Sequence, residues 1–260
     1  MSSAPASNNS SSPRSSNFGA VFTRLANPGR FLALSKWLLP LSAVLAALFL
    51  GAGLYVAFFA SPPDYQQGDT VRIMYLHVPA AWMALFTYVS MAIAAFIGLV
   101  WKHVLAELYA KAVAPVGAGF TFICLVTGSL WGRPMWGTWW VWDARLTSEL
   151  VLFLIYLAYM ALRASMDDEA KAARAAAILA LVGAINLPII HYSVTWWNTL
   201  HQGASVFRSG GSALAPVFFW PVILIVLAYT SAFGSLWLVR IRGEVWRRRA
   251  EAAALRAARA

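Results

Sequence analysis

The chain alternates between long apolar stretches and short polar connections. Six stretches reach about the 20 residues that a helix needs to cross a bilayer. Polar backbone groups inside lipid must be satisfied within their own segment, so each stretch is predicted to be an α-helix. The pattern predicts an all-α integral membrane protein with a six-transmembrane-helix bundle, and a kink in the fifth helix near Pro188. The six stretches cover residues 38–59, 73–101, 112–130, 146–162, 175–194 and 213–239.

Composition supports a membrane protein and divides the chain into three parts. Hydrophobic residues make up 60% and charged residues 12% of the sequence, whereas soluble domains are about 25% charged. The start is rich in Ser, Asn and Pro, which is typical of disorder. We therefore expect a disordered or cytoplasmic N-terminal segment over 1–37, a membrane domain over 38–239 and a basic cytoplasmic tail over 240–260.

The distribution of basic residues predicts the orientation. The N-terminal segment, the second and fourth connections and the tail together hold 16 of the 20 Lys and Arg residues. By the positive-inside rule these parts are cytoplasmic, with both termini on that side and the third connection facing outward. The net charge of +10 therefore needs no nucleic-acid partner. The tail from Arg240 to Arg259 is predicted to be a basic helix that binds anionic membrane lipids.

The third connection is rich in tryptophan, with five in the thirteen residues 131–143. A buried ring removes about 150–250 Å² from water, which a hydrophilic connection does not need. An aromatic belt at the membrane edge is the alternative, but a belt scatters one or two rings per helix end. The cluster instead predicts a platform for a flat, apolar ligand. Its members are Trp131, Trp136, Trp139, Trp140 and Trp142.

Three of the four histidines fall on the same outer face as the tryptophans: His77, His191 and His201. An ionisable residue at membrane depth is a functional candidate, although a single histidine of this kind is more often a hydrogen-bonded structural residue. Histidines beside a tryptophan cluster suggest haem, which is flat, apolar and bound through iron by axial imidazoles. The residues alone do not choose His201 over His191.

Charged residues beside the cluster complete the predicted haem site. Arg133 and Arg145 could pair with haem propionates. Asp143 could cap a helix, hold Arg145 or orient a ligand histidine. The single cysteine, Cys124, excludes an internal disulfide and thioether attachment of haem. Haem would therefore be non-covalent haem b. The sequence also has no phosphate-binding loop and no His-Glu-x-x-His zinc motif.

Several strings resemble one known family. Trp136-Gly137-x-x-Trp140-x-Trp142-Asp143 matches the WWD signature of the haem-handling proteins of cytochrome c biogenesis. Over residues 38–239 the chain resembles their six-span branch, the haem exporter protein C (CcmC) family. The resemblance extends to the strings at 64–68, 75–81, 142–150 and 186–203.

The resemblance implies a function and a ligand set. In that family two outer-face histidines hold haem, and the matching strings assign these roles to His77 and His201. His191 stays a candidate for a supporting or packing role. The implied protein is not an enzyme. It lies in the bacterial inner membrane and presents haem at the periplasmic face to the haem chaperone CcmE. The other implied partners are the small subunit CcmD and the ABC transporter CcmA–CcmB.

Two other functions remain possible on the residues alone. A membrane electron-transfer protein with b-type haem would usually place ligand histidines inside the bundle, often in pairs at two depths. A small-molecule permease would be expected to have helices broken near the middle of the membrane in both halves. The stretch Gly117-Ala118-Gly119 hints weakly at the latter, although small residues also serve helix packing.

Overall fold

The computed structural model describes residues 27–201, 203, 206 and 210–259. Within these residues six helical segments are long and apolar enough to cross a membrane, which confirms the predicted all-α class and the six spans. The predicted N-terminal segment 1–37 lies outside the described residues up to residue 26. The elements are α2 (Pro28–Tyr55), η1 (Val56–Ala60), η2 (Asp69–Ile73), α3 (Met74–Trp101), α4 (Val104–Trp136), α5 (Ala144–Ala164), α6 (Glu169–Gly183), α7 (Asn186–Trp196) and α8 (Pro216–Ala257).

The helices run beyond the apolar stretches because polar capping residues set their ends. The side chain of Asn27 accepts a hydrogen bond from the Gly29 amide at 2.8 Å. Asp168 accepts from the amides of Ala170 and Lys171 at 3.0 and 3.1 Å. Such caps satisfy amides that have no partner within the helix. Helices α4 and α8 are also long, with 33 and 42 residues, well above the about 20 that a bilayer requires, although no side chain caps the start of α8.

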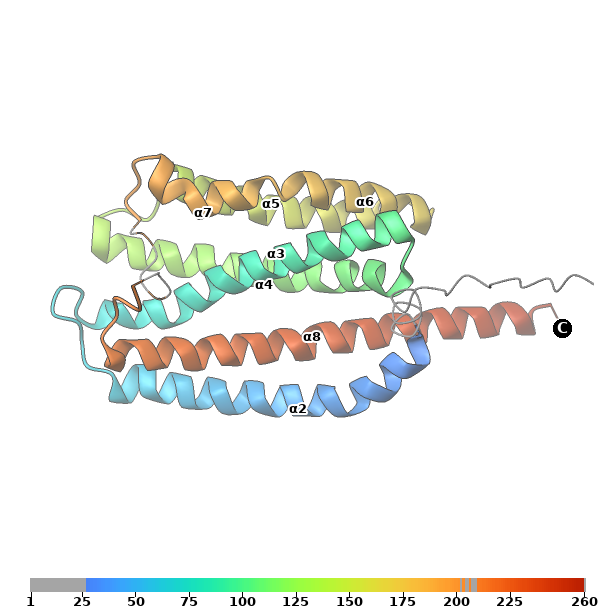
Figure 1. The fold of residues 1–260 in the computed structure, drawn as a ribbon, viewed down its shortest axis with the longest axis horizontal. Helices are drawn as coiled ribbons and strands as arrows, with labels where there is room; N and C mark the ends of the chain where they lie inside the picture. Colours follow the sequence, from blue (N-terminus) through green and yellow to red (C-terminus); the bar gives the residue numbers. More distant parts are fainter. Residues whose placement is uncertain (1–26, 202, 204–205, 207–209, 260) are drawn as a thin grey trace, which may run out of the picture.

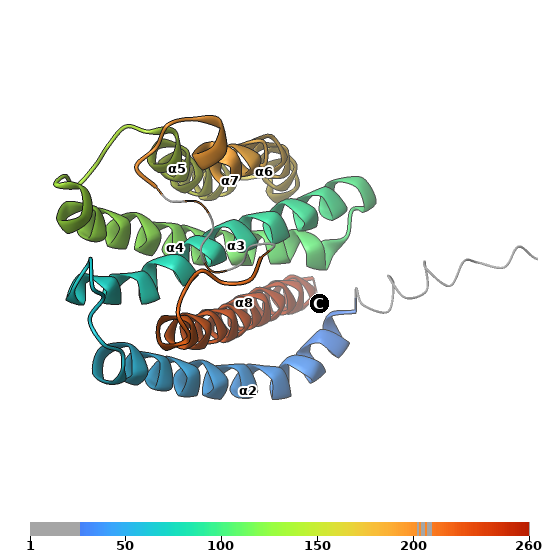
Figure 2. The same cartoon turned by 60° about the vertical axis from the view of Figure 1, so that its left-hand side comes forward.

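The six spans run alternately up and down and form three layers. The pair α3 and α4 lies in the middle, with α2 and α8 on one side and α5, α6 and α7 on the other (Figures 1 and 2). Helix α2 packs mainly against α8. The first residue of α2 and the last residue of α8 lie at the same end of the bundle. At this end α8 extends past the other helices (Figure 1).

The fifth span is two helices, α6 and α7, separated at Ala184 and Ile185. This break lies just before Pro188, where the sequence predicts a kink. Pro188 itself is in the first turn of α7, where a missing amide hydrogen costs little. The Asn186 amide group donates to the Ser148 carbonyl of α5 at 2.8 Å. This bond ties the break to the neighbouring helix.

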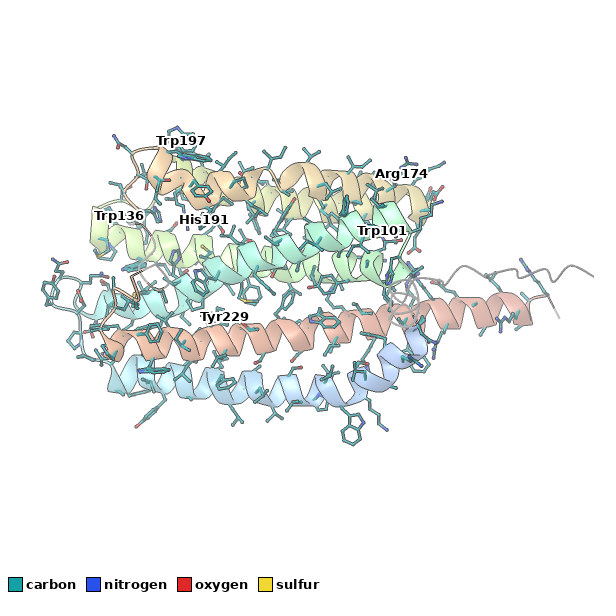
Figure 3. The ribbon with its side chains drawn as sticks, in the orientation of Figure 1. Trp101, Trp136, Arg174, His191, Trp197 and Tyr229 are labelled. Carbon is teal, nitrogen blue, oxygen red and sulfur yellow. The ribbon has the colours of Figure 1, made fainter. Side chains whose placement is uncertain are left out.

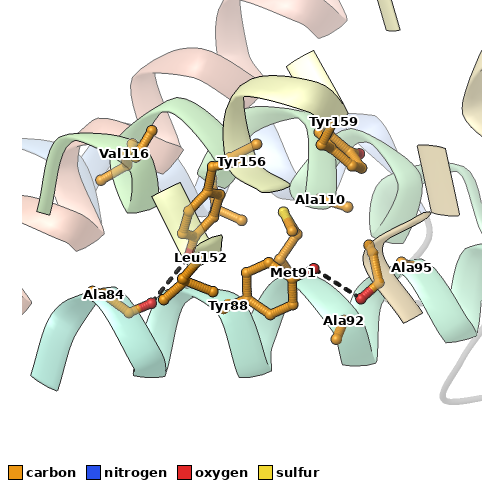
Figure 4. Close-up of a cluster of buried hydrophobic side chains, with 14 of the residues drawn as sticks. Ala84, Tyr88, Met91, Ala92, Ala95, Ala110, Val116, Leu152, Tyr156 and Tyr159 are labelled. Carbon is orange, nitrogen blue, oxygen red and sulfur yellow. Dashed lines mark hydrogen bonds between the residues drawn. The ribbon is translucent and has the colours of Figure 1, made fainter. Parts of the chain in front are cut away.

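The middle of the bundle is organised by two buried tyrosines (Figure 4). The rings of Tyr88 and Tyr156 meet edge-on, with centroids 5.1 Å apart. The Tyr88 hydroxyl donates to the Ala180 carbonyl at 3.1 Å, and the Tyr156 hydroxyl donates to the Ala84 carbonyl at 3.0 Å. Gly117 of α4 faces Tyr156 so closely that an added Cβ would overlap its ring. These contacts join α3, α4, α5 and α6.

At the end of the bundle where α8 leaves, charged side chains join α4, α6 and α8; we call this the basic end. Glu244 of α8 lies 3.2 Å from Lys111 of α4 and 3.4 Å from Arg248. Glu169 of α6 lies 2.8 Å from Arg247. The Glu244 side chain is only 15% exposed, so its charge is screened less by water than those of its exposed neighbours.

We expect Glu244→Gln to lower the free energy of unfolding by about 1 kcal/mol, because it removes the acidic partner shared by Lys111, Arg247 and Arg248. Thermal unfolding in detergent measures the change, and salt should reduce the difference from wild type. Glu251→Gln is the control, since Glu251 is 56% exposed and pairs with Arg247. If both substitutions lower the free energy of unfolding by the same amount, the low exposure of Glu244 does not strengthen its ion pairs.

Candidate functional site

The predicted site residues cluster at the end of the bundle opposite the basic end. Trp136 and Trp197 mark this end, whereas Trp101 and Arg174 lie at the other (Figure 3). We call it the tryptophan end. It brings together the start of α3, the end of α4, the start of α5 and the connection that follows α7.

The tryptophan-rich segment differs from the predicted connection because its first half is helical. Helix α4 continues through Pro134 and ends at Trp136. Gly137, with φ +77°, takes the left-handed conformation that commonly ends a helix. Asp143 then caps α5, because its Oδ1 accepts from the Leu146 amide at 2.8 Å. Trp131 and Trp136 therefore sit on the last turns of a helix, and the connection itself is short.

His77 lies on α3 and is held against α4. Its Nδ1 is 3.1 Å from the Cys124 carbonyl oxygen and 3.1 Å from the Thr127 hydroxyl. The Trp131 ring packs edge-on against the imidazole, with centroids 5.7 Å apart. Trp131 is itself fixed, since its Nε1 donates to the Gln67 side chain at 3.0 Å. The imidazole is thus oriented by backbone, hydroxyl and aromatic contacts.

His201 lies in the connection after α7 and approaches from the other side. Its amide donates to the Thr199 hydroxyl at 2.9 Å. The Trp136 ring lies over its imidazole, with centroids 4.9 Å apart. Its Nδ1 lies 3.8 Å from Asp143 Oδ2, which is too long for a hydrogen bond. Asp143 therefore caps α5, one of the roles that the sequence left open, and its Oδ2 faces His201.

Burial favours the neutral form of the His201 imidazole. Burial is the largest cause that lowers its pKa from 6.5, and the Arg145 guanidinium lowers it further. Asp143 acts in the opposite direction and offsets part of the shift. Because the net shift is downward, His201 is mostly uncharged at pH 7. A neutral imidazole is the form that binds a metal.

The two histidines line one cavity of about 50 Å³. Trp140, Arg145 and Glu149 also line it. The volume holds a few waters, whereas drug-sized ligands occupy pockets of about 300–1,000 Å³. The cavity as it stands is too small for a porphyrin. The donor set fits one, because it offers two imidazoles, an arginine and an aromatic wall.

Unpaired polar atoms gather around this cavity. Within the described part of the chain, six buried side-chain atoms have no hydrogen-bond partner. Four of them are Trp140 Nε1, Asp143 Oδ2, Glu149 Oε1 and His201 Nδ1. Buried polar groups are normally paired, and each exception calls for an explanation. Their concentration beside the two histidines is characteristic of a binding site.

Of the other predicted residues, only Arg145 is among the residues that line the cavity in the described part of the chain. Trp139 and Trp142 are 56% and 75% exposed, so the five tryptophans do not form a single flat surface. His191 is exposed and packs edge-on against Tyr192. Arg133 is exposed and donates to the Gly137 carbonyl. Arg145 lines the cavity and donates to the Ile190 carbonyl at 2.6 Å, which links α5 to α7.

Sequence reasoning missed the residues that support the histidines. Thr127 and Gly128 contact His77, yet each lies in an unremarkable apolar stretch. Their spacing could have identified them, because positions i, i+3, i+4 and i+7 share one face of a helix. On α4 these positions are Cys124, Thr127, Gly128 and Trp131. No signal in the sequence marked Glu149, although its side chain lines the cavity.

Comparison with known proteins gives a consistent result. The family model described as heme exporter protein C matches residues 21–256. Heme exporter protein C of Bradyrhizobium diazoefficiens is 58% identical over 225 residues, which cover 86% of this chain and 85% of that protein. The protein of the same name from Escherichia coli strain K12 is 50% identical over 219 residues, covering 84% and 88%. That of Paracoccus denitrificans is 45% identical over 236 residues, covering 90% and 98%.

Proposed function

The chain belongs to the heme exporter protein C family, and we propose that it binds haem b at the tryptophan end and presents it to the haem chaperone CcmE. Membership makes it a multi-pass membrane protein that handles haem in cytochrome c biogenesis rather than a catalytic enzyme. The observation that carries the proposal is that His77 and His201, from separate elements, line one cavity, each packed against a tryptophan.

The proposed ligands are His77 and His201, one on each side of the iron. Imidazole is a ligand of the kind that holds haem iron. Trp131, Trp136 and Trp140 pack around the macrocycle. Arg145 is the cavity-lining arginine and pairs with a propionate. Asp143 faces His201 and orients it.

Haem binding requires the cavity of about 50 Å³ to widen. His77 is held by α4, whereas His201 lies in a connection where its Nδ1 has no hydrogen-bond partner among the described residues. We therefore expect His201, rather than His77, to move when the cavity widens.

The exposed rings of Trp139 and Trp142 supply the docking surface for the chaperone. Large aromatic residues dominate binding energy at protein interfaces. The distribution of basic residues supports a periplasmic position for this end in the bacterial inner membrane. We assign CcmD and the transporter CcmA–CcmB as the remaining partners. The ATPase would then be a separate chain.

We expect Trp142→Ala to leave haem on this chain but to reduce covalent haem on co-expressed CcmE. Loss of an anchoring tryptophan weakens an interface by about 2 kcal/mol, or about thirtyfold in affinity. The measurements are the visible spectrum of the purified chain and haem staining of the chaperone. Wild type that carries no haem would contradict the proposed function.

The matched control is Trp37→Ala. Trp37 on α2 is also 75% exposed, and it lies in the first helix, away from the tryptophan end. It should leave chaperone loading unchanged. If Trp37→Ala and Trp142→Ala reduce loading equally, the exposed rings near Asp143 are not the docking surface.

A further inference from the structure

The contacts of His77 reveal which of its ring nitrogens carries the proton. Nδ1 has two neighbours at 3.1 Å, the Cys124 carbonyl oxygen and Thr127 Oγ1. A carbonyl oxygen only accepts hydrogen bonds. If Nδ1 carried no hydrogen, its lone pair would face the lone pairs of that oxygen at hydrogen-bonding distance, and the two atoms would repel each other. The carbonyl therefore favours a proton on Nδ1.

The Thr127 hydroxyl points to the same conclusion. Its oxygen lies 2.6 Å from the Ile123 carbonyl, one helical turn back, and 3.2 Å from the Cys124 carbonyl, so the shorter contact assigns its single hydrogen to Ile123. Threonine in a helix commonly makes this bond. With its hydrogen engaged there, Oγ1 offers a lone pair to His77. Both neighbours of Nδ1 are then acceptors.

The α4 surface is shaped to bring the ring this close. A Cβ at Gly128 would lie 3.0 Å from His77 Cε1, so only glycine allows the imidazole to approach without displacement. Trp131 covers the ring one turn further on. Residues 124, 127, 128 and 131 thus form one helical stripe that contacts a single histidine.

We propose that Thr127, together with the Cys124 carbonyl, holds His77 as the Nδ1–H tautomer and so leaves Nε2 as the nitrogen that binds iron. This assignment of Thr127 as a positioning residue rests on the proposed function insofar as His77 is a haem ligand. The tautomer itself does not depend on haem. A hydrogen bond from the far nitrogen of a ligating histidine fixes its orientation and raises its basicity.

The first test reads the tautomer directly. The full chain labelled with ¹⁵N-histidine contains four histidines, and the resonances lost in His77→Ala identify His77. We expect a neutral ring protonated on Nδ1 in wild type. In Thr127→Val the population of that tautomer should fall, and in Thr127→Ser it should recover. A ring protonated on Nε2 in wild type would overturn the assignment.

The second test reads the bound haem. In Thr127→Val we expect the dissociation constant for haem to rise about tenfold, the lower end of the usual loss when such a partner is removed, because the Cys124 carbonyl remains. The midpoint reduction potential should become more positive, since a less basic ligand stabilises ferric iron less. Thr127→Ser should restore both values.

Thr121→Val is the matched control. Thr121 is on the same helix, is fully buried and also donates to the carbonyl four residues back, at 2.8 Å. It is expected to leave tautomer, affinity and potential unchanged. Identical behaviour of Thr127→Val and Thr121→Val would overturn the inference.

The proposed function fails separately from the role of Thr127. If wild type binds no haem, or if His77→Ala binds it as wild type does, the proposed ligand is wrong. The ¹⁵N spectrum still decides whether Thr127 and the Cys124 carbonyl set the protonation of the ring.

Discussion

Alanine at His77 is expected to abolish six-coordinate haem in the purified chain, and alanine at His201 to have the same effect. Each substitution removes one axial bond, and the partners described for these two rings offer no second imidazole to replace it. The visible spectra of the oxidised and reduced proteins should lose their low-spin bands. Haem transferred to the co-expressed chaperone should fall to background in both variants.

His191→Ala is the control for these variants. His191 is also at the tryptophan end of the bundle. It is exposed, however, and packs on Tyr192 rather than lining the cavity. Its spectrum should match wild type. Loss of the low-spin bands in His191→Ala with their retention in His201→Ala would show that the second ligand is His191. The haem-handling function would survive that result.

The second large effect is expected for Gly117→Ala, which should destabilise the bundle. The added Cβ would overlap the Tyr156 ring and force α4 away from α5. Overpacking costs about 1–3 kcal/mol, and the Tyr156 hydroxyl, displaced from the Ala84 carbonyl, adds about 1–3 kcal/mol more as an unpaired buried group. We expect a lower melting temperature in detergent and less monodisperse protein.

Gly119→Ala serves as the control, because it lies two residues away on the same helix with open space around its Cβ. There alanine should be neutral or stabilising by up to about 1 kcal/mol, as in most helix interiors. Tyr156→Phe separates the two causes, since it removes the hydroxyl and keeps the ring. If Gly117→Ala and Gly119→Ala have the same melting temperature, the contact between Gly117 and Tyr156 is not tight.

The sequence predicts the six spans because length and hydropathy are properties of each segment alone. It does not predict their ends equally well. The apolar stretch of the third span ends at residue 130, but α4 continues through Pro134 to Trp136 and ends at Gly137, the glycine that adopts a positive φ. The same holds for α2, which begins at its Asn27 cap rather than at the first apolar residue of the span.

For the site, residue types suggested the ligand class, but only packing shows how the site is built. Nothing in the sequence distinguishes Trp140, which faces the cavity, from Trp142, which faces outward. The direction of each ring depends on the turn between Gly137 and Asp143. Similarly, the contact between His77 and Thr127 joins residues 50 positions apart, and it exists only because α3 packs on α4.

The tyrosines at the centre of the bundle also determine where His77 stands. Each hydroxyl reaches the carbonyl of one particular residue on a neighbouring helix. Sliding one helix along its axis by the rise of one residue, about 1.5 Å, without rotation would move that carbonyl away from the hydroxyl that contacts it. Both buried hydrogen bonds would then be lengthened beyond the usual range. These two hydrogen bonds therefore hold α3 at one position along its axis. They also fix the position of His77, which lies eleven residues from Tyr88 on the same helix.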